Sequence, residues 1–560
     1  MKKIIDSIRI NFNHNHFILI WTILNLIQIG TTELTSDEGY YWFYSSKLEW
    51  GYYDHPPLLA LLIKMGRVLF RGELGVRLFN VLLMSAGLFF LFKIVQWTKR
   101  GKKFVYLIIL SIPLFNYITF IAFPDTPLVA FSIICLYSYK RLLYKNDLMS
   151  SLFFGVSFAL MLYSKYHAVI FVLFIILSNL SLLRNKYFYF SIILSGVLFI
   201  PHLLWQYQHD FPSFQYHLSG RASQFEFSNL FQFISQQIPI IGIGIIFIPF
   251  IYKPENQFEK TLKYITIGTF IFFLLSTLRG FVHLHWTSIV LFPIIILSAK
   301  YYSLKRDNRL FNYLVIPFLI LILFVRFYLA FQILPVNTLH VDYYHGRKQW
   351  AEDIKAIAGN RPVIFETGNG ALREAPLYSF YSKSMGIALY SGGGKKSQYQ
   401  VWNYEDSIQS KNIILVMGGQ FEGSEEYPTR MGKSIHYKEI DNFTSFNNIK
   451  IKYNVEDIIY EEDSIKILVQ ILNHRQYPVS FTNNHKIYIS LRNEENEELT
   501  FEKTFNNSMS IQACDTANLY FSFSSREMDG GGYEFFFGIK DGITYPSINS
   551  KRNKLLVTKN

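Results

Sequence analysis

Long apolar segments recur along the first 333 residues, and short polar connections separate them. A membrane-spanning helix needs about 20 mostly apolar residues, so the pattern predicts about eleven spans. Their approximate ranges are 16–33, 75–97, 103–122, 126–144, 149–164, 166–183, 187–205, 229–252, 261–279, 285–302 and 310–333. A further apolar helix, from Leu58 to Phe70, is too short to span. Lys64, Arg67 and Arg71 give it a basic stripe, which predicts a helix lying in the membrane interface.

After Ile333 the apolar runs become short. A helix-like stretch and two strand-like stretches with glycine-rich turns predict a small α/β domain at 334–447. Alternating short strands with Asn, Asp and Gly turns predict a β-sandwich at 448–560. The predicted fold class is therefore a polytopic α-helical membrane protein, with a transmembrane domain at 1–333 and a C-terminal α/β plus β-sandwich region.

Composition agrees with a membrane protein, because half of the residues are hydrophobic and 18% are aromatic. The net charge of +13 does not predict nucleic-acid binding, since Lys and Arg form short clusters between apolar runs. Placing the N-terminus in the cytoplasm puts these clusters inside, as the positive-inside rule expects. The opening loop at 31–74 and the C-terminal domains then lie outside. The two cysteines fall in different compartments, so no disulfide or Cys-based metal site is predicted.

The loops predicted to lie outside contain the candidate catalytic and binding residues. The opening loop holds Asp37-Glu38 and Asp54-His55, and a later loop holds Asp125. Such carboxylates also occur at helix N-termini for structural reasons, and Asp125 before Thr-Pro is a good N-cap. Ionisable groups near the membrane nevertheless favour function, and a carboxylate is the usual base for a hydroxyl acceptor.

Cations occupy two other outward loops. They are Lys165, Arg279, His283 and His285, together with His167. A snorkelling role at helix ends is the structural alternative to a phosphate contact. The histidines lack the spacing of zinc ligands, so no metal site is predicted, although an assisting divalent cation stays open.

In their order and sidedness these motifs resemble the GT-C membrane glycosyltransferases, in the branch of the protein O-mannosyltransferases and the bacterial aminoarabinose transferases of lipid A. The matching pieces cover most of residues 17 to 400. They are Asp37-Glu38, Asp54-His55-Pro56-Pro57, Pro124-Asp125, Ser164-Lys165-Tyr166, PHLLWQYQHDFPSFQYH, HLHWTSIVLFP and EAPLYSFYS.

The resemblance implies an inverting transferase at the outer face of the bacterial inner membrane. Its donor would be a polyprenyl-phosphate-linked monosaccharide, and its acceptor a lipid such as lipid A, a glycan or a protein. Asp37 matches the principal catalytic aspartate, with Glu38 or Asp125 assisting. The donor phosphate would contact residues that can carry a positive charge, namely His55, Lys165, Arg279, His283 and His285. Substrate contacts are expected from Tyr40, Tyr41, Asp54 and Tyr166.

His55 stands where the aminoarabinose enzymes carry a lysine, and Tyr40 where they often carry an arginine. Neutral hexose donors are therefore as compatible with the sequence as aminoarabinose. Two other classes stay open. One is a transporter or lipid flippase, although no inverted repeat or broken-helix pair is apparent. The other is a receptor or assembly protein that works through its C-terminal β domain.

Overall fold

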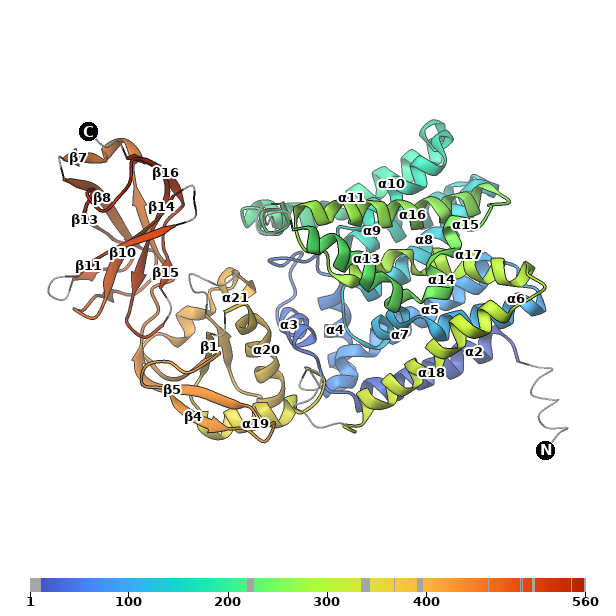
Figure 1. Cartoon of the computed structure of the whole chain (residues 1–560), viewed down its shortest axis with the longest axis horizontal. Helices are drawn as coiled ribbons and strands as arrows, with labels where there is room; N and C mark the ends of the chain where they lie inside the picture. Colours follow the sequence, from blue (N-terminus) through green and yellow to red (C-terminus); the bar gives the residue numbers. More distant parts are fainter. Residues whose placement is uncertain are drawn as a thin grey trace. The chain divides into compact units, whose positions relative to one another are not determined.

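The structure is a computed structural model. It describes all residues except 1–11, 219–225, 334–342, 367, 390–395, 462, 494, 496, 506–508, 545 and 558–560. The chain divides into two compact units, Met1–Gln349 and Trp350–Asn560. The first unit is helical and the second is rich in strands (Figure 1).

The helical unit begins, within the described residues, with α2 (His14–Thr31). The α-helices that follow are α3 (Ser36–Tyr44), α4 (Leu58–Leu69), α5 (Gly72–Ile94), α6 (Lys99–Ser111), α7 (Pro113–Phe120), α8 (Asp125–Lys145), α9 (Leu148–Ser164), α10 (Ala168–Ser178), α11 (Lys186–Gln208), α12 (Pro212–Leu218), α13 (Phe227–Ile241), α14 (Ile243–Ile246), α15 (Ile248–Ile251), α16 (Gln257–Ser276), α17 (Leu291–Leu304) and α18 (Arg309–Ala330). Three 3₁₀ segments, η1 (Leu180–Arg184), η2 (Thr277–Arg279) and η3 (Leu284–Val290), extend neighbouring helices.

Five of these segments are long and apolar enough to cross a membrane, or up to eight if each bent pair counts as one span. Two further apolar helices, α9 and α10, are shorter. The chain is thus a multi-pass membrane protein, while the count of about eleven spans stays a prediction.

The chain bends sharply at three places, within two of the predicted spans and at the end of the first. α6 and α7 meet at 69°, where Pro113 removes a backbone donor. α13 and the segment Ile243–Ile251 meet at 98°, where Gly242 has a φ of +100°. α2 and α3 meet at 95°. This last bend turns the chain out of the first span and into the opening loop.

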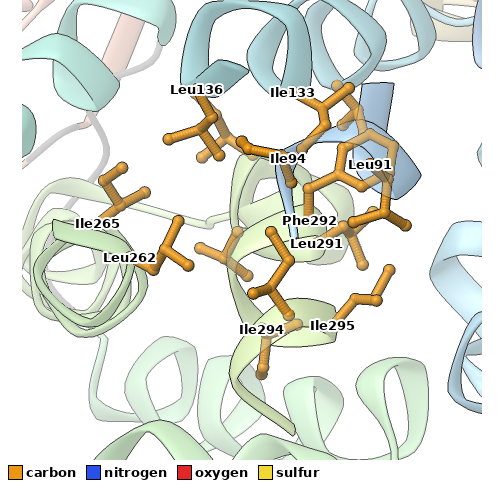
Figure 2. Close-up of a cluster of buried hydrophobic side chains, with 14 of the residues drawn as sticks. Leu91, Ile94, Ile133, Leu136, Leu262, Ile265, Leu291, Phe292, Ile294 and Ile295 are labelled. Carbon is orange, nitrogen blue, oxygen red and sulfur yellow. The ribbon is translucent and has the colours of Figure 1, made fainter. Parts of the chain in front are cut away.

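The core of the helical unit lies around α17. Figure 2 shows Leu291, Phe292, Ile294 and Ile295 of α17 facing side chains of α5, α8 and α16. Close backbone contact also fixes α4 against α5, since a Cβ at Gly66 would lie 2.0 Å from the Gly75 carbonyl oxygen. The predicted helix from Leu58 to Phe70 is thereby held beside the opening loop.

The second unit first forms a five-stranded sheet of order β2-β1-β3-β5-β4. Its strands are β1 (Val363–Glu366), β2 (Gly386–Ala388), β3 (Lys411–Met417), β4 (Glu425–Pro428) and β5 (Ser434–Phe443). β1 pairs in parallel with β2 and β3, whereas β5 pairs antiparallel with β3 and β4. The accompanying helices are α19 (Arg347–Ala358), α20 (Ala371–Ser382) and α21 (Gln398–Val401), with short 3₁₀ segments η5 (Gly368–Gly370) and η6 (Tyr404–Ile408).

The last part of the chain is antiparallel. One sheet has the order β11-β10-β14-β15 with β16 on β14, another has β13-β8-β6 with β7 on β8, and β9 pairs with β12. The strands are β6 (Ile449–Tyr453), β7 (Ile459–Glu461), β8 (Ser464–Asn473), β9 (Val479–Ser480), β10 (Lys486–Arg492), β11 (Glu498–Thr504), β12 (Ser510–Ile511), β13 (Thr516–Ser524), β14 (Gly531–Lys540), β15 (Ser547–Ile548) and β16 (Asn553–Val557). One shared apolar core joins the sheets, as in a β-sandwich.

Candidate functional site

The opening loop starts with α3, whose sequence sets its own beginning. Thr35 is the N-cap, and its hydroxyl accepts a hydrogen bond from the Glu38 backbone N–H, while the Glu38 side chain accepts one from the Thr35 N–H. This capping box fixes the first turn. Asp37, Tyr40, Tyr41 and Tyr44 follow at helical spacing along α3.

Asp37 is half-buried, and Tyr343 donates a hydrogen bond from its hydroxyl to Oδ2 at 3.1 Å. Tyr343 lies beyond α18, at the far end of the helical unit's sequence. Its neighbour Tyr344 approaches Tyr117 of α7, with the two hydroxyl oxygens 3.5 Å apart. The carboxylate predicted to be the base therefore keeps some exposure and has a hydroxyl donor beside it.

Glu38 has a different environment. Its side chain is fully buried and forms an ion pair with Arg77 of α5, with Nε of Arg77 2.6 Å from Oε1. Oε1 also accepts from the Ala122 N–H at 2.8 Å, and Oε2 from Thr35 and from Nη2 of Arg77. Both oxygens of this carboxylate thus accept hydrogen bonds, from the N-cap of α3, from α5 and from the segment before α8.

Arg77 extends this network to the end of α2. Its guanidinium donates to the carbonyl oxygens of Thr32 at 2.6 Å and of Glu33 at 2.8 Å. A buried arginine with a carboxylate and carbonyls around it is satisfied and costly to remove. The Glu38–Arg77 pair therefore holds the turn between α2 and α3 in place.

Asp54 forms a second acidic centre in the loop. Its Oδ1 accepts from Tyr44 at 2.6 Å and from Tyr40 at 3.5 Å, and Nδ1 of His55 lies 2.8 Å away. Burial opposes ionisation of this carboxyl, but His55, the Tyr44 hydroxyl and His217 outweigh it and hold the pKa of Asp54 at about 2. Nε2 of His217 lies 3.0 Å from the Asp54 carbonyl oxygen.

Asp125 forms the third centre. It is the first residue of α8 and makes no capping bond, so the capping role considered from the sequence is not realised. Instead, Nζ of Lys165 lies 2.9 and 3.1 Å from its two carboxylate oxygens, and Ser288 donates to Oδ1 at 2.6 Å. Nε2 of His285 lies 3.9 Å from Oδ2.

A row of rings connects the second and third centres. The ring of Tyr41 lies 5.3 Å from that of His55 and 6.2 Å from that of Phe123. Phe123 in turn stacks on His285 at 5.9 Å, and His285 on His283 at 5.6 Å. The opening loop, the start of α8 and the segment around η3 thus meet in one place.

Two further predicted residues, Tyr166 and Arg279, are not members of this row. Tyr166 shares a hydrogen bond of 2.8 Å with Nε2 of His202, and its ring lies 5.7 Å from that of His217, the residue beside Asp54. Arg279 ends η2 with an exposed side chain. Among the described residues, no three His, Cys, Asp or Glu side chains are grouped as metal ligands.

Sequence reasoning missed four members of the site, namely Arg77, Tyr343, His217 and Ser288. Arg77 had a signal, because it is a charged residue inside the predicted span 75–97. Tyr343 had none, since the contact with Asp37 joins residues 306 positions apart.

Comparison with known proteins gives three similarities. Residues 54–205 match the family model described as dolichyl-phosphate-mannose-protein mannosyltransferase. The lipid A galacturonosyltransferase RgtD of Rhizobium johnstonii is 23% identical over 443 residues, which cover 73% of this chain and 91% of that protein.

Solved structures of ArnT from Cupriavidus metallidurans share the fold. The apo structure has a TM-score of 0.56 at 12% identity, and the structure bound to undecaprenyl phosphate 0.54 at 13%. Each comparison covers 75% of this chain and 97% of the other. Together with the sequence matches, they confirm the predicted resemblance and support a glycosyltransferase with the GT-C fold of the ArnT-like branch.

Proposed function

We propose that the chain transfers a monosaccharide from a polyprenyl-phosphate donor to a lipid acceptor, with inversion at the anomeric carbon, at the outer face of a bacterial inner membrane. The observation that carries this proposal is the place of Asp37, a partly exposed carboxylate one helical turn before Tyr41 on α3, because Tyr41 begins the row of imidazole and phenyl rings that joins the opening loop to α8 and η3. Fold alone would not suffice, since one fold supports many substrates.

In this reaction Asp37 is the general base. It takes the proton of the acceptor hydroxyl as the hydroxyl oxygen bonds to the anomeric carbon from the face opposite the phosphate. The bond between that carbon and the phosphate oxygen breaks, and polyprenyl phosphate leaves with the electron pair. Tyr343 holds the Asp37 carboxylate by its hydrogen bond at 3.1 Å and so fixes the direction in which it faces.

Glu38 takes a positioning role in this proposal instead of the assisting role expected from the sequence. Its two oxygens already accept hydrogen bonds from Arg77, Thr35 and Ala122. A fully buried carboxylate whose oxygens contact these donors is not within reach of an acceptor hydroxyl.

The leaving phosphate needs positive charge and donors. His55, His283 and His285 belong to the row of rings, and Lys165 adjoins it through Asp125. Asp125 holds the Lys165 ammonium by two contacts of 2.9 and 3.1 Å, next to His285 of the row. In this proposal Asp125 therefore positions Lys165 for the phosphate, and Arg279 supplements the charge.

The prenyl tail would follow α4. Leu61, Met65 and Val68 of this helix are exposed, which gives it an apolar outer face. Arg67 bends back instead, donating to Ser45 at 2.7 Å and lying 4.8 Å from the Trp42 ring centroid. A helix with this arrangement suits the boundary between headgroups and acyl chains.

The names of similar proteins favour a lipid acceptor. RgtD is named a lipid A galacturonosyltransferase, and ArnT was solved with undecaprenyl phosphate. We therefore propose lipid A as the first acceptor to test and a polyprenyl-phosphate sugar as the donor. The sugar stays open, and glycan and protein acceptors are the alternatives.

The test compares cells with and without the protein by mass spectrometry of lipid A, lipid-linked sugars and surface glycans. The proposal expects one monosaccharide to disappear from lipid A while its polyprenyl-phosphate form accumulates. Loss of the monosaccharide from a protein or a glycan instead would identify that molecule, and not lipid A, as the acceptor. An unchanged set of glycoconjugates, with lipid flipping by the purified protein in vesicles, would contradict the transferase.

A further inference from the structure

Arg326 is a charged residue inside an apolar helix. It lies four residues before the end of α18, a candidate span with a mean hydropathy of 2.4 in its most apolar part. At a rise of about 1.5 Å per residue, the residue is about 6 Å from that end. Among the described residues, no carboxylate lies within ion-pair distance of it, although charged residues in a membrane usually pair or mark a site.

Two amide side chains hold the guanidinium. Nη1 donates to Oδ1 of Asn116 at 3.1 Å, and Nη2 to Oδ1 of Asn25. Both amides are themselves fixed, since Nδ2 of Asn25 donates to the Trp21 carbonyl and Nδ2 of Asn116 to that of Ile112. The positive charge is therefore rigidly placed between α2, α7 and α18 by neutral partners.

Within the part of the chain that the structure describes, not every donor of the guanidinium has an acceptor. It has five N–H groups, and the hydrogen bonds to described residues use two nitrogens, while Nε donates to none of them. The ring of Phe120 lies under it, with its centroid 5.2 Å from the guanidinium carbon. A guanidinium held in this way can donate two parallel hydrogen bonds to a further acceptor.

The surroundings are those of a lipid-facing surface. Arg326 is half-buried, and Phe327 and Leu323 beside it on α18 are exposed, as are Ile23 and Ile27 on α2. Gln28 of α2 donates to the Arg326 carbonyl at 3.2 Å, so the residue is level with the end of α2 that leads to Asp37. Apolar side chains flanking a fixed cation near a helix end fit a lipid headgroup with its acyl chains.

We propose that Arg326 binds the phosphate of an anionic membrane lipid at the end of the helical unit where Asp37 lies. A phosphate supplies a negative charge, which the described residues do not place beside the guanidinium, and the paired oxygens that the planar guanidinium fork recognises. The site uses none of the residues assigned to the donor phosphate. It does not depend on the transferase reaction.

The test measures lipid binding to the purified full chain in detergent, by native mass spectrometry and thermal unfolding. The added probes are phosphatidic acid, phosphatidylglycerol, phosphatidylcholine and inorganic phosphate. The natural chain is expected to bind the two anionic lipids at least tenfold more tightly than phosphatidylcholine. Arg326→Met should remove that preference and Arg326→Lys weaken it. Arg309→Met, at the other end of the same helix, should leave it unchanged.

Asn25→Asp provides a second variant in case Arg326→Met fails to fold. It places a carboxylate beside the guanidinium, so the chain should fold while its preference for anionic lipid falls by a similar factor. Unchanged lipid preference in the folded variants would overturn the proposal and leave Arg326 a link between helices. Equal effects of inorganic phosphate and lipid would also overturn it, in favour of a site for free phosphate.

Discussion

Nε of Arg77 lies 2.6 Å from Oε1 of Glu38, and neither side chain is exposed. This pair distinguishes two adjacent carboxylates that are chemically alike in the sequence. Glu38 is turned into the protein and used for structure, whereas Asp37 is half-buried and contacts Tyr343. The assignment of Asp37 as the base rests on that difference as well as on the resemblance.

Arg77→Met is expected to destabilise the helical unit by about 3–5 kcal/mol, because it leaves a buried carboxylate without its partner. Thermal unfolding in detergent measures this loss. Glu38→Gln keeps a similar shape and two of the acceptor contacts, so this variant should lose less stability than Arg77→Met. If both variants unfold at the temperature of the natural chain, the pair does not hold the α2–α3 turn.

Variants of the Asp125–Lys165 pair can distinguish an effect on stability from an effect on catalysis. Lys165→Met should lower both, because Asp125 is buried and loses its cation. Adding Asp125→Asn removes the unpaired charge, so the double variant should regain stability but not transfer. Unfolding temperature and initial rates of the natural chain and the two variants test this. Recovery of transfer in the double variant would remove Lys165 from the phosphate site.

Asp54 leads to a prediction about pH. Its pKa of about 2 in the folded chain lies below the 3.8 of a free carboxyl, so ionised Asp54 stabilises the fold above pH 4. That contribution, about 2 kcal/mol from the pKa difference, is lost as the pH falls from 4 to 2. The stability difference between Asp54→Asn and the natural chain should therefore be largest above pH 4 and shrink below it. A difference that stays constant down to pH 2 would mean that the pKa of Asp54 is not lowered.

Transfer is expected to continue in excess EDTA. The Lys165 ammonium beside Asp125 supplies positive charge for the phosphate, and the described residues contain no group of three side chains that could hold a metal ion. Initial rates with and without EDTA, at fixed ionic strength, make the comparison. A loss of more than tenfold that Mg²⁺ or Mn²⁺ restores would show that a divalent ion takes part.

Much of the fold follows from periodicity. The stretch predicted as an interfacial helix forms α4. PVIFE contains β1, NIILVMGG contains all of β3 except Lys411, and YEFFFGI contains most of β14. These patterns are local, so the sequence displays them directly. The bends at Pro113 and Gly242 were not foreseen, although proline and glycine mark such sites.

The sequence offers candidate site residues but not their arrangement. Residue type and sidedness selected Asp54, His55, Asp125 and Lys165. In the structure His55 contacts Asp54, and Lys165 contacts Asp125. Which atoms they contact depends on tertiary packing that no local pattern encodes. The clearest examples are the ion pair between Glu38 and Arg77 and the hydrogen bond from Tyr343 to Asp37.

The most direct measurement is transfer by Asp37→Asn in purified form, from a polyprenyl-phosphate sugar to lipid A, beside the natural chain and Glu38→Gln. The substitution keeps the shape and the oxygen that can accept from Tyr343, so the unfolding temperature should change little. Loss of the base should lower the rate by about 10²–10⁴-fold. The account predicts that loss for Asp37→Asn in a chain that stays folded. Transfer at the natural rate by Asp37→Asn would contradict it.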